Sequence, residues 1–107
     1  MKLKGTKLQQ FMEIEEALKS AIAIIGDYCF RTRDKFDFDT PIPYGQGVDV
    51  FLLKAESLYM KAFPEAEVNF LKVNTINDIY KKIEWARKEF AKNSTTQPLK
   101  MTEIDGD

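Results

Sequence analysis

Three aspartates that lie close together, Asp34, Asp37 and Asp39, are the side chains best placed for chemistry in this chain of 107 residues. Neighbouring carboxylates can gather around a hard cation such as Ca²⁺. The segment lacks the ligand spacing and the closing glutamate of a calcium loop. We therefore interpret the three aspartates as hydrated loop acids and predict no metal site.

Other catalytic side chains are scarce. The chain contains no histidine and a single cysteine, Cys29. Histidine is the commonest general base. Its absence excludes the usual serine and cysteine triads and most zinc sites. Cys29 lies in an apolar stretch and is interpreted as a small core residue. Tyr44-Gly45-Gln46-Gly47 follows no suitable strand and is interpreted as a turn. We predict that the protein is not an enzyme and binds no cofactor.

Helical periodicity predicts the elements that hold these residues. A first helix is expected over residues 6–29, a second over 49–63, and a last one that begins at residue 74 or 75 and whose apolar stripe reaches Phe90. Thr6 and Gln9 have capping-box spacing, and Gly26 could end the first helix. The expected core positions are Phe11, Ile14, Ala17, Leu18, Ala21, Ile22, Ile25 and Cys29, then Phe51, Leu52, Ala55, Leu58, Tyr59, Ala62 and Phe63, then Ile76, Ile79, Tyr80, Ile83, Ala86 and Phe90.

The segments between the helices also carry local signals. Two prolines and two glycines within residues 31–47 exclude a long helix, so this segment is predicted to be a long loop held to the core by Phe36, Phe38 and Ile42. Asp49 is expected to be the N-cap of the second helix. Asp78, three residues after Thr75, is expected to cap the last helix. A short turn or helix is expected around residues 66–71.

These elements predict an all-α fold, a small bundle of three to four helices in one domain over residues 1–92, with a flexible tail over 93–107. The formal charge of −1, from 16 basic and 17 acidic residues, argues against nucleic-acid binding. The chain shows no signal peptide and no apolar run long enough to cross a bilayer, so no membrane partner is expected and the cytoplasm is the expected compartment.

The order of elements resembles that of an acyl carrier protein over roughly residues 6–90. Asp37-Phe38-Asp39-Thr40-Pro41-Ile42 is similar to the loop that precedes the carrier signature, and Thr75-Ile76-Asn77-Asp78-Ile79-Tyr80-Lys81-Lys82-Ile83 resembles the start of the last carrier helix. The resemblance implies a long first helix, a long loop, a second helix that carries a modified serine at its start, a short third helix and a final helix.

The chain departs from that family where the serine should stand. The aligned position is Asp49, within Val48-Asp49-Val50. An aspartate cannot accept phosphopantetheine, because the attachment needs a hydroxyl group. The acidic second helix of carriers is also changed, since Lys54 and Lys61 lie on its outward side. The resemblance thus implies a carrier-like domain without its prosthetic group.

Two features predict a partner surface instead. Val50, Leu53 and Met60 lie on the side of the second helix opposite its core stripe, where a surface helix should be polar. That second stripe is either buried by the loop or open to another protein. Trp85 lies opposite the apolar stripe of the last helix and is either an interface residue or packed against the loop or the tail. The predicted partner-binding residues are Val50, Leu53, Lys54, Met60, Lys61 and Trp85.

We therefore expect a non-enzymatic helical domain that binds another protein, with pairing of two copies through the second helix left open. The first alternative is a carrier or a domain that binds a small apolar ligand. The second is a small regulator or inhibitor built on an unrelated helical bundle.

Overall fold

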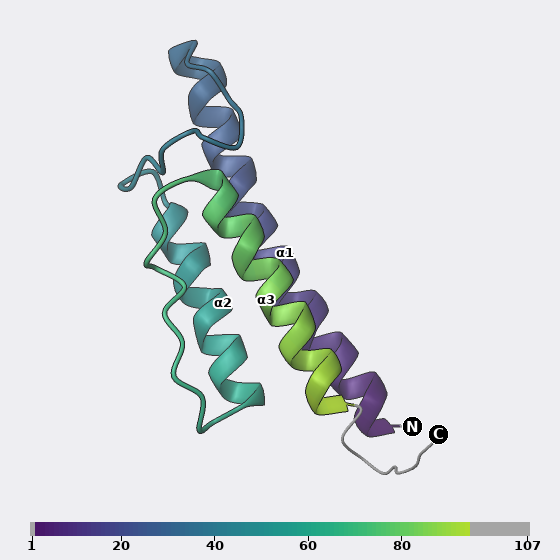
Figure 1. Cartoon of the computed structure of the whole chain (residues 1–107). Coiled ribbons are helices and arrows are strands. Elements are labelled where there is room, and N and C mark those ends of the chain that lie inside the picture. The colour runs from purple at the N-terminus through teal and green to yellow at the C-terminus, as the bar shows by residue number, and fades with distance from the viewer. Residues whose placement is uncertain (1, 95–107) are drawn as a thin grey trace.

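The computed structural model describes residues 2–94, with side chains for residues 7–92. Within that part the chain forms three helices and no strand: α1 (Lys2–Thr32), α2 (Val48–Ala62) and α3 (Ile76–Ser94). Figure 1 shows α2 and α3 both running antiparallel to α1, which spans the length of an elongated molecule of 54 × 23 × 21 Å. The predicted all-α class is confirmed. Because α3 reaches residue 94, the predicted boundary at 92 falls inside it, and the remaining predicted tail, 95–107, lies outside the described residues.

The first helix is longer than its predicted range of 6–29. It has 31 residues, about 46 Å at 1.5 Å per residue. Its predicted inner face is confirmed, since all the core residues expected there are buried. The helix continues through Gly26, which therefore does not end it. A Cβ atom on Gly26 would lie 3.2 Å from Cζ of Phe36, so the glycine leaves room for that ring against the helix.

The start of α2 differs from the expectation. Gly47 is its N-cap, with a φ of 90° that favours glycine, and no side chain caps the helix. Asp49 lies in the first turn, so its predicted N-cap role is wrong. A carboxylate there still interacts favourably with the positive end of the helix dipole. Val48, absent from the predicted stripe, is fully buried.

The start of α3 agrees with the expectation. Oδ2 of Asp78 accepts hydrogen bonds from the backbone N–H groups of Asn74 at 2.9 Å and Thr75 at 3.1 Å. These two hydrogen bonds lower the pKa of the Asp78 carboxyl, because they stabilise its charged form. The residue pattern thus located both the helix start and the side chain that caps it.

The core consists of one stripe from each helix. In α2 the predicted positions Leu52, Ala55 and Tyr59 are buried, and the other expected positions of that helix are partly buried against the core. In α3 the predicted stripe is buried except at Tyr80, which is exposed and meets Phe38 edge-on with ring centroids 5.5 Å apart. Tyr80 therefore belongs to the surface, because the ring that it contacts, Phe38 of the loop before α2, is itself exposed.

The α1–α2 loop and the α2–α3 connection are bonded to each other at one end of the bundle. Ile42 N–H donates to the carbonyl of Asn74, and Ile76 N–H donates to the carbonyl of Thr40, both at 3.1 Å. The Tyr44 hydroxyl also reaches the carbonyls of Leu71 at 3.0 Å and Val73 at 2.8 Å. Residues 66–71 form turns and extended chain, so no fourth helix lies between α2 and α3.

An aromatic cluster joins α2 to α3 towards the other end. Tyr59 stacks on Trp85 with ring centroids 5.0 Å apart, and Phe63 meets Phe90 at 4.8 Å. Phe70 of the connection meets Tyr59 at 5.9 Å and Trp85 at 6.2 Å. Rings of this size fill the space between helices whose Cα atoms, in the described part of the chain, lie more than 8 Å apart.

Candidate protein-interaction surface

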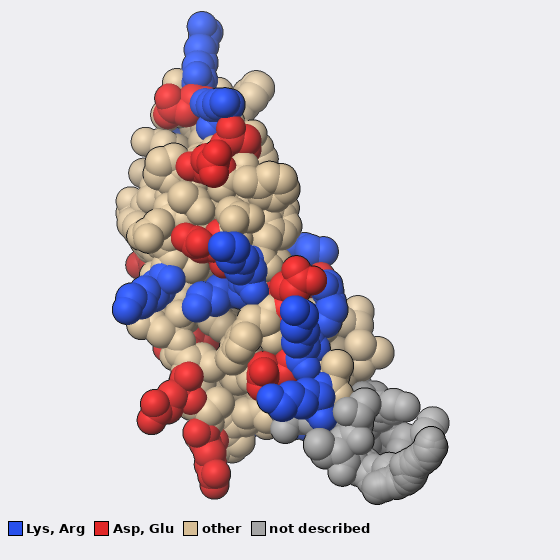
Figure 2. Space-filling model, in the orientation of Figure 1, with Lys and Arg blue, Asp and Glu red and all other residues tan. Residues whose placement is uncertain are grey.

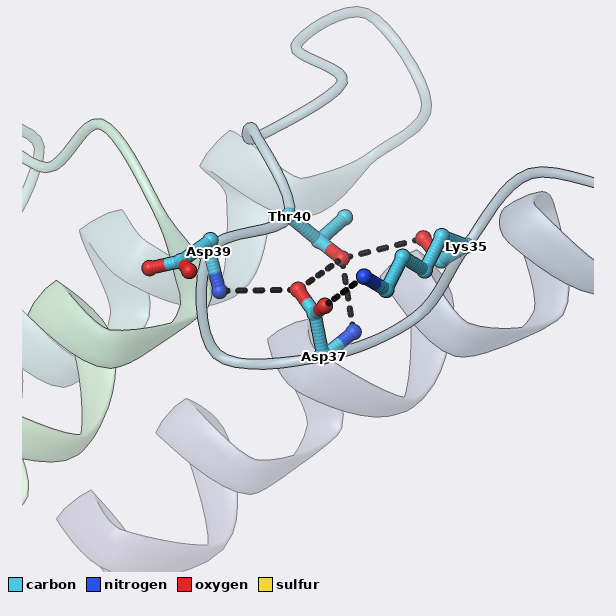
Figure 3. A network of polar contacts seen from close by, with 4 residues as sticks. All are labelled: Lys35, Asp37, Asp39 and Thr40. Carbon is cyan, nitrogen blue, oxygen red and sulfur yellow. Dashed lines mark hydrogen bonds and ion pairs between the residues drawn. The ribbon is translucent and has the colours of Figure 1, made fainter.

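The three loop aspartates do not form a common site. Figure 3 shows that Asp37 belongs to a local network: it forms an ion pair with Lys35 at 3.2 Å and accepts from the backbone N–H of Asp39 at 2.9 Å. The hydrogen bond from Lys35 is the main cause that lowers the pKa of Asp37. Asp34 instead accepts from the Thr32 hydroxyl at 2.7 Å.

The same network explains a buried polar residue that the sequence did not single out. The Thr40 hydroxyl accepts from the Asp37 N–H at 2.8 Å and donates to the Lys35 carbonyl at 3.0 Å. These bonds shape the loop into a turn, which is a structural task for the residues involved. No group of metal-ligating side chains that could hold an ion occurs in the described residues.

A cleft of about 530 Å³ lies between the end of α1 and this loop, lined by Tyr28, Cys29 and residues of the segment 34–43. Cys29 is buried, as predicted for a core residue. Burial raises the pKa of the Cys29 thiol, and the Asp34 carboxylate acts in the same direction. A protonated thiol is a poor nucleophile, so the cleft offers no activated group for covalent chemistry at Cys29.

The second apolar stripe of α2 is open to solvent. The exposed fractions are 61% for Val50, 49% for Leu53 and 41% for Met60, and Ser57 between them is exposed as well. The sequence left open whether the loop covers this stripe. The structure shows that it does not, because residues 33–47 fold against the end of α1 and the start of α3 (Figure 1).

Charged residues border the stripe on both sides. Lys54 and Lys61 are exposed, and neither forms an ion pair with another described residue. Glu56 lies on the other side, where its Oε1 accepts from the backbone N–H of Phe70 at 2.9 Å. No sequence pattern indicated this bond, which ties the α2–α3 connection to α2.

Trp85 is a packed residue with a partly open face. It is 38% exposed, and its ring contacts are with Tyr59 and Phe70, both of which are buried. Burial, with a smaller contribution from Glu89, raises the pKa of Tyr59 to about 12. The ring contacts of Trp85 are thus with α2 and the α2–α3 connection, whereas the packing partner expected from the sequence was the loop or the tail.

A set of four exposed aromatic side chains was not predicted from the sequence. Phe36, Phe38, Tyr44 and Tyr80 are all exposed, whereas Phe36 and Phe38 were expected to hold the loop to the core. Only Ile42 of the three expected anchors is buried. Figure 2 shows a broad area without charged side chains over the α1–α2 loop and the start of α3. The alternation of aromatic and charged residues over 35–39 was the sequence signal that could have predicted an exposed segment here.

Charge on the remaining surface is mixed. Figure 2 shows basic side chains gathered along the lower part of α3, with acidic side chains between them. None of the helices in the described part of the chain combines the length and the apolar character that crossing a bilayer needs.

The fold and this surface define a class: a small three-helix domain with one helix that is apolar on two sides. Comparison of the chain with models of protein families, with curated proteins and with solved structures finds no match.

Proposed function

We propose that this chain is a non-enzymatic helical interaction domain that binds another protein through the outward face of α2. The observation that carries the proposal is the exposure of Val50, Leu53 and Met60 on one side of a helix whose opposite side is buried in the core. Burial of apolar surface contributes about 25 cal/mol per Å², so covering three large side chains favours association. Lys54 and Lys61 beside them add a charged border.

The helix is ready to bind without further folding. Its inner face is anchored by Val48, Leu52 and Ala55, all fully buried. A partner therefore does not have to supply the free energy of helix nucleation. Recognition of one helix face by a partner helix or groove is a common mode of protein binding.

We also infer that the domain is carrier-like in arrangement and carries no prosthetic group. A long first helix, a long loop and a second helix with Asp49 in its first turn support this inference. The segment 63–75, which contains no helix, departs from the carrier pattern and favours the alternative of an unrelated helical bundle. Incubation with a phosphopantetheinyl transferase, followed by intact mass measurement, tests the first inference. We expect no gain in mass, and a gain would contradict it.

The binding proposal is tested with a double variant, Leu53→Ser and Met60→Ser. Both residues are half exposed, so we expect little loss of stability and a loss of proteins that the tagged wild-type chain retains from its host. A matched control changes Leu8 and Met12 of α1 to serine, since these are apolar residues that are somewhat more exposed than Leu53 and Met60. Retention of the same proteins by the α2 variant would contradict the proposal.

A further inference from the structure

We propose that the outward face of α2 pairs with the same face of a second copy of this chain, with the two α2 helices parallel about a two-fold axis. This inference rests on the proposed function and names its partner. The spacing of the exposed residues on α2 and the charges on either side of them support it.

The exposed residues of α2 follow a seven-residue repeat. Val50 and Ser57 are seven residues apart, and so are Leu53 and Met60. Along the helix the spacing alternates: three residues from Val50 to Leu53, four to Ser57 and three to Met60. This is the a and d pattern of a coiled coil: Val50 and Ser57 at a, Leu53 and Met60 at d. All four are exposed in the described structure. A β-branched residue at a with leucine at d favours parallel two-stranded pairing.

The flanking charges select a parallel partner. Asp49 and Glu56 occupy the g positions and Lys54 and Lys61 the e positions of the same repeat. In a parallel pair, each g residue faces the e′ residue five places further along the other helix. Asp49 then faces Lys54 of the second copy, and Glu56 faces Lys61 of the second copy. The two-fold axis repeats each of these two pairs once. In an antiparallel pair, identical flanks would meet, lysine against lysine and acid against acid.

The structure leaves these groups available. Lys54 and Lys61 are exposed and have no ion pair within the described residues. Glu56 accepts one hydrogen bond, from Phe70 N–H, and a carboxylate has capacity for further donors. The α2 helix has 15 residues, about 22 Å, which limits the pairing to two heptads. The dimer is therefore concentration-dependent.

Charge exchange tests the pairing. We expect the mass measured by sedimentation equilibrium to rise from monomer to dimer with concentration. Lys54→Glu should weaken the dimer by roughly tenfold, because two symmetry-related attractions become repulsions. The double variant Asp49→Lys with Lys54→Glu should restore the wild-type affinity. Thermal unfolding of each variant checks that the monomer still folds. A wild-type chain that stays monomeric, or a double variant that is not restored, would overturn the proposal.

A cysteine placed at an a position tests the direction of the helices. In a parallel pair, residue 57 faces its own copy within disulfide range. We expect Ser57→Cys, in a Cys29→Ala background, to form a disulfide-linked dimer under mild oxidation. Ala23→Cys, exposed on α1, should remain monomeric in the same background. Absence of a linked dimer of the Ser57→Cys variant would overturn parallel pairing. If self-association fails while the Leu53 and Met60 variant still loses another protein, the proposed function stands and this inference falls.

Discussion

Among single residues, Arg33 carries the clearest backbone strain in the described chain. It follows the end of α1 with a φ of 62°, a left-handed conformation. The N–H of Asp34 donates to the carbonyl of Cys29 at 2.9 Å, and the N–H of Arg33 donates to that of Phe30 at 3.4 Å. This is the pattern of a Schellman cap, in which glycine is the usual residue. The two bonds hold Arg33 in a conformation that disfavours a Cβ atom.

We expect Arg33→Gly to stabilise the protein by about 0.5–1 kcal/mol, because relief of the left-handed strain exceeds the entropy that glycine adds to the unfolded chain. Urea denaturation followed by the fluorescence of Trp85, the only tryptophan, measures the change. Arg31→Gly, in the last turn of the same helix, is the control and should destabilise. A destabilised Arg33→Gly variant would show that the guanidinium makes a contribution beyond the backbone.

Among the helices, α3 has a capping contact at its start and an aromatic contact with its neighbours further along. Asp78 holds the first turn by accepting two backbone N–H groups. Further along the helix, Trp85 covers Tyr59 of α2 and Phe70 of the connection. The helix is thereby fixed to the connection and to α2 by one charged and one aromatic side chain.

The carboxylate of Asp78 makes the stability of α3 sensitive to acid. Its pKa is lowered from 3.8 in the folded protein. Its contribution is therefore complete above pH 3.8 and is lost as the pH falls through the lower folded value. We expect Asp78→Asn to reduce the acid dependence of the free energy of unfolding, measured by urea denaturation from about pH 5 downward, roughly the range in which carboxyls titrate. Part of the acid dependence should remain in this variant, because the pKa of Asp37 is also lowered. An unchanged slope would mean that the cap does not titrate.

The stacking of Trp85 should contribute to stability. We expect Trp85→Ala to lower the free energy of unfolding by about 2–3 kcal/mol, less than for a fully buried tryptophan because one face is open. Circular dichroism during urea denaturation gives the value. Lys88→Ala, an exposed position on the same helix, should change it little. A loss below about 0.5 kcal/mol, the usual range of surface substitutions, would argue that Trp85 serves a partner more than the core.

In the molecule as a whole, α1 is the element against which the other two helices pack. Different contacts hold the segments together at the two ends of the bundle. One end is closed by backbone hydrogen bonds between the two connections. Towards the other, Lys7 of α1 donates to the carbonyl of Ala62 at 3.1 Å and lies 4.3 Å from the centre of the Phe63 ring. The outward face of α2 lies between these closures and is left open.

The Tyr44 hydroxyl joins the two connections. We expect Tyr44→Phe to cost about 1 kcal/mol of stability, since the one hydroxyl proton shared between two backbone carbonyls is lost. Amide exchange at Ile42 and Ile76 should become faster, because their bonds bridge the same connections. Tyr28→Phe is the control, since the Tyr28 hydroxyl has no hydrogen bond to another described residue. Unchanged exchange at both amides would show that the bridge holds without Tyr44.

The helices and their inner faces could be predicted from the sequence, because the 3.6-residue period that places Ile14, Leu18 and Ile25 on one side acts within a single element. The Asp78 cap could be located for the same reason, since it is a local hydrogen bond. The exposure of the second stripe of α2, the bond between Glu56 and Phe70 and the stacking of Trp85 became visible only in the folded chain. Each of these depends on where a distant segment lies, and residues that far apart leave no periodic signal in either segment.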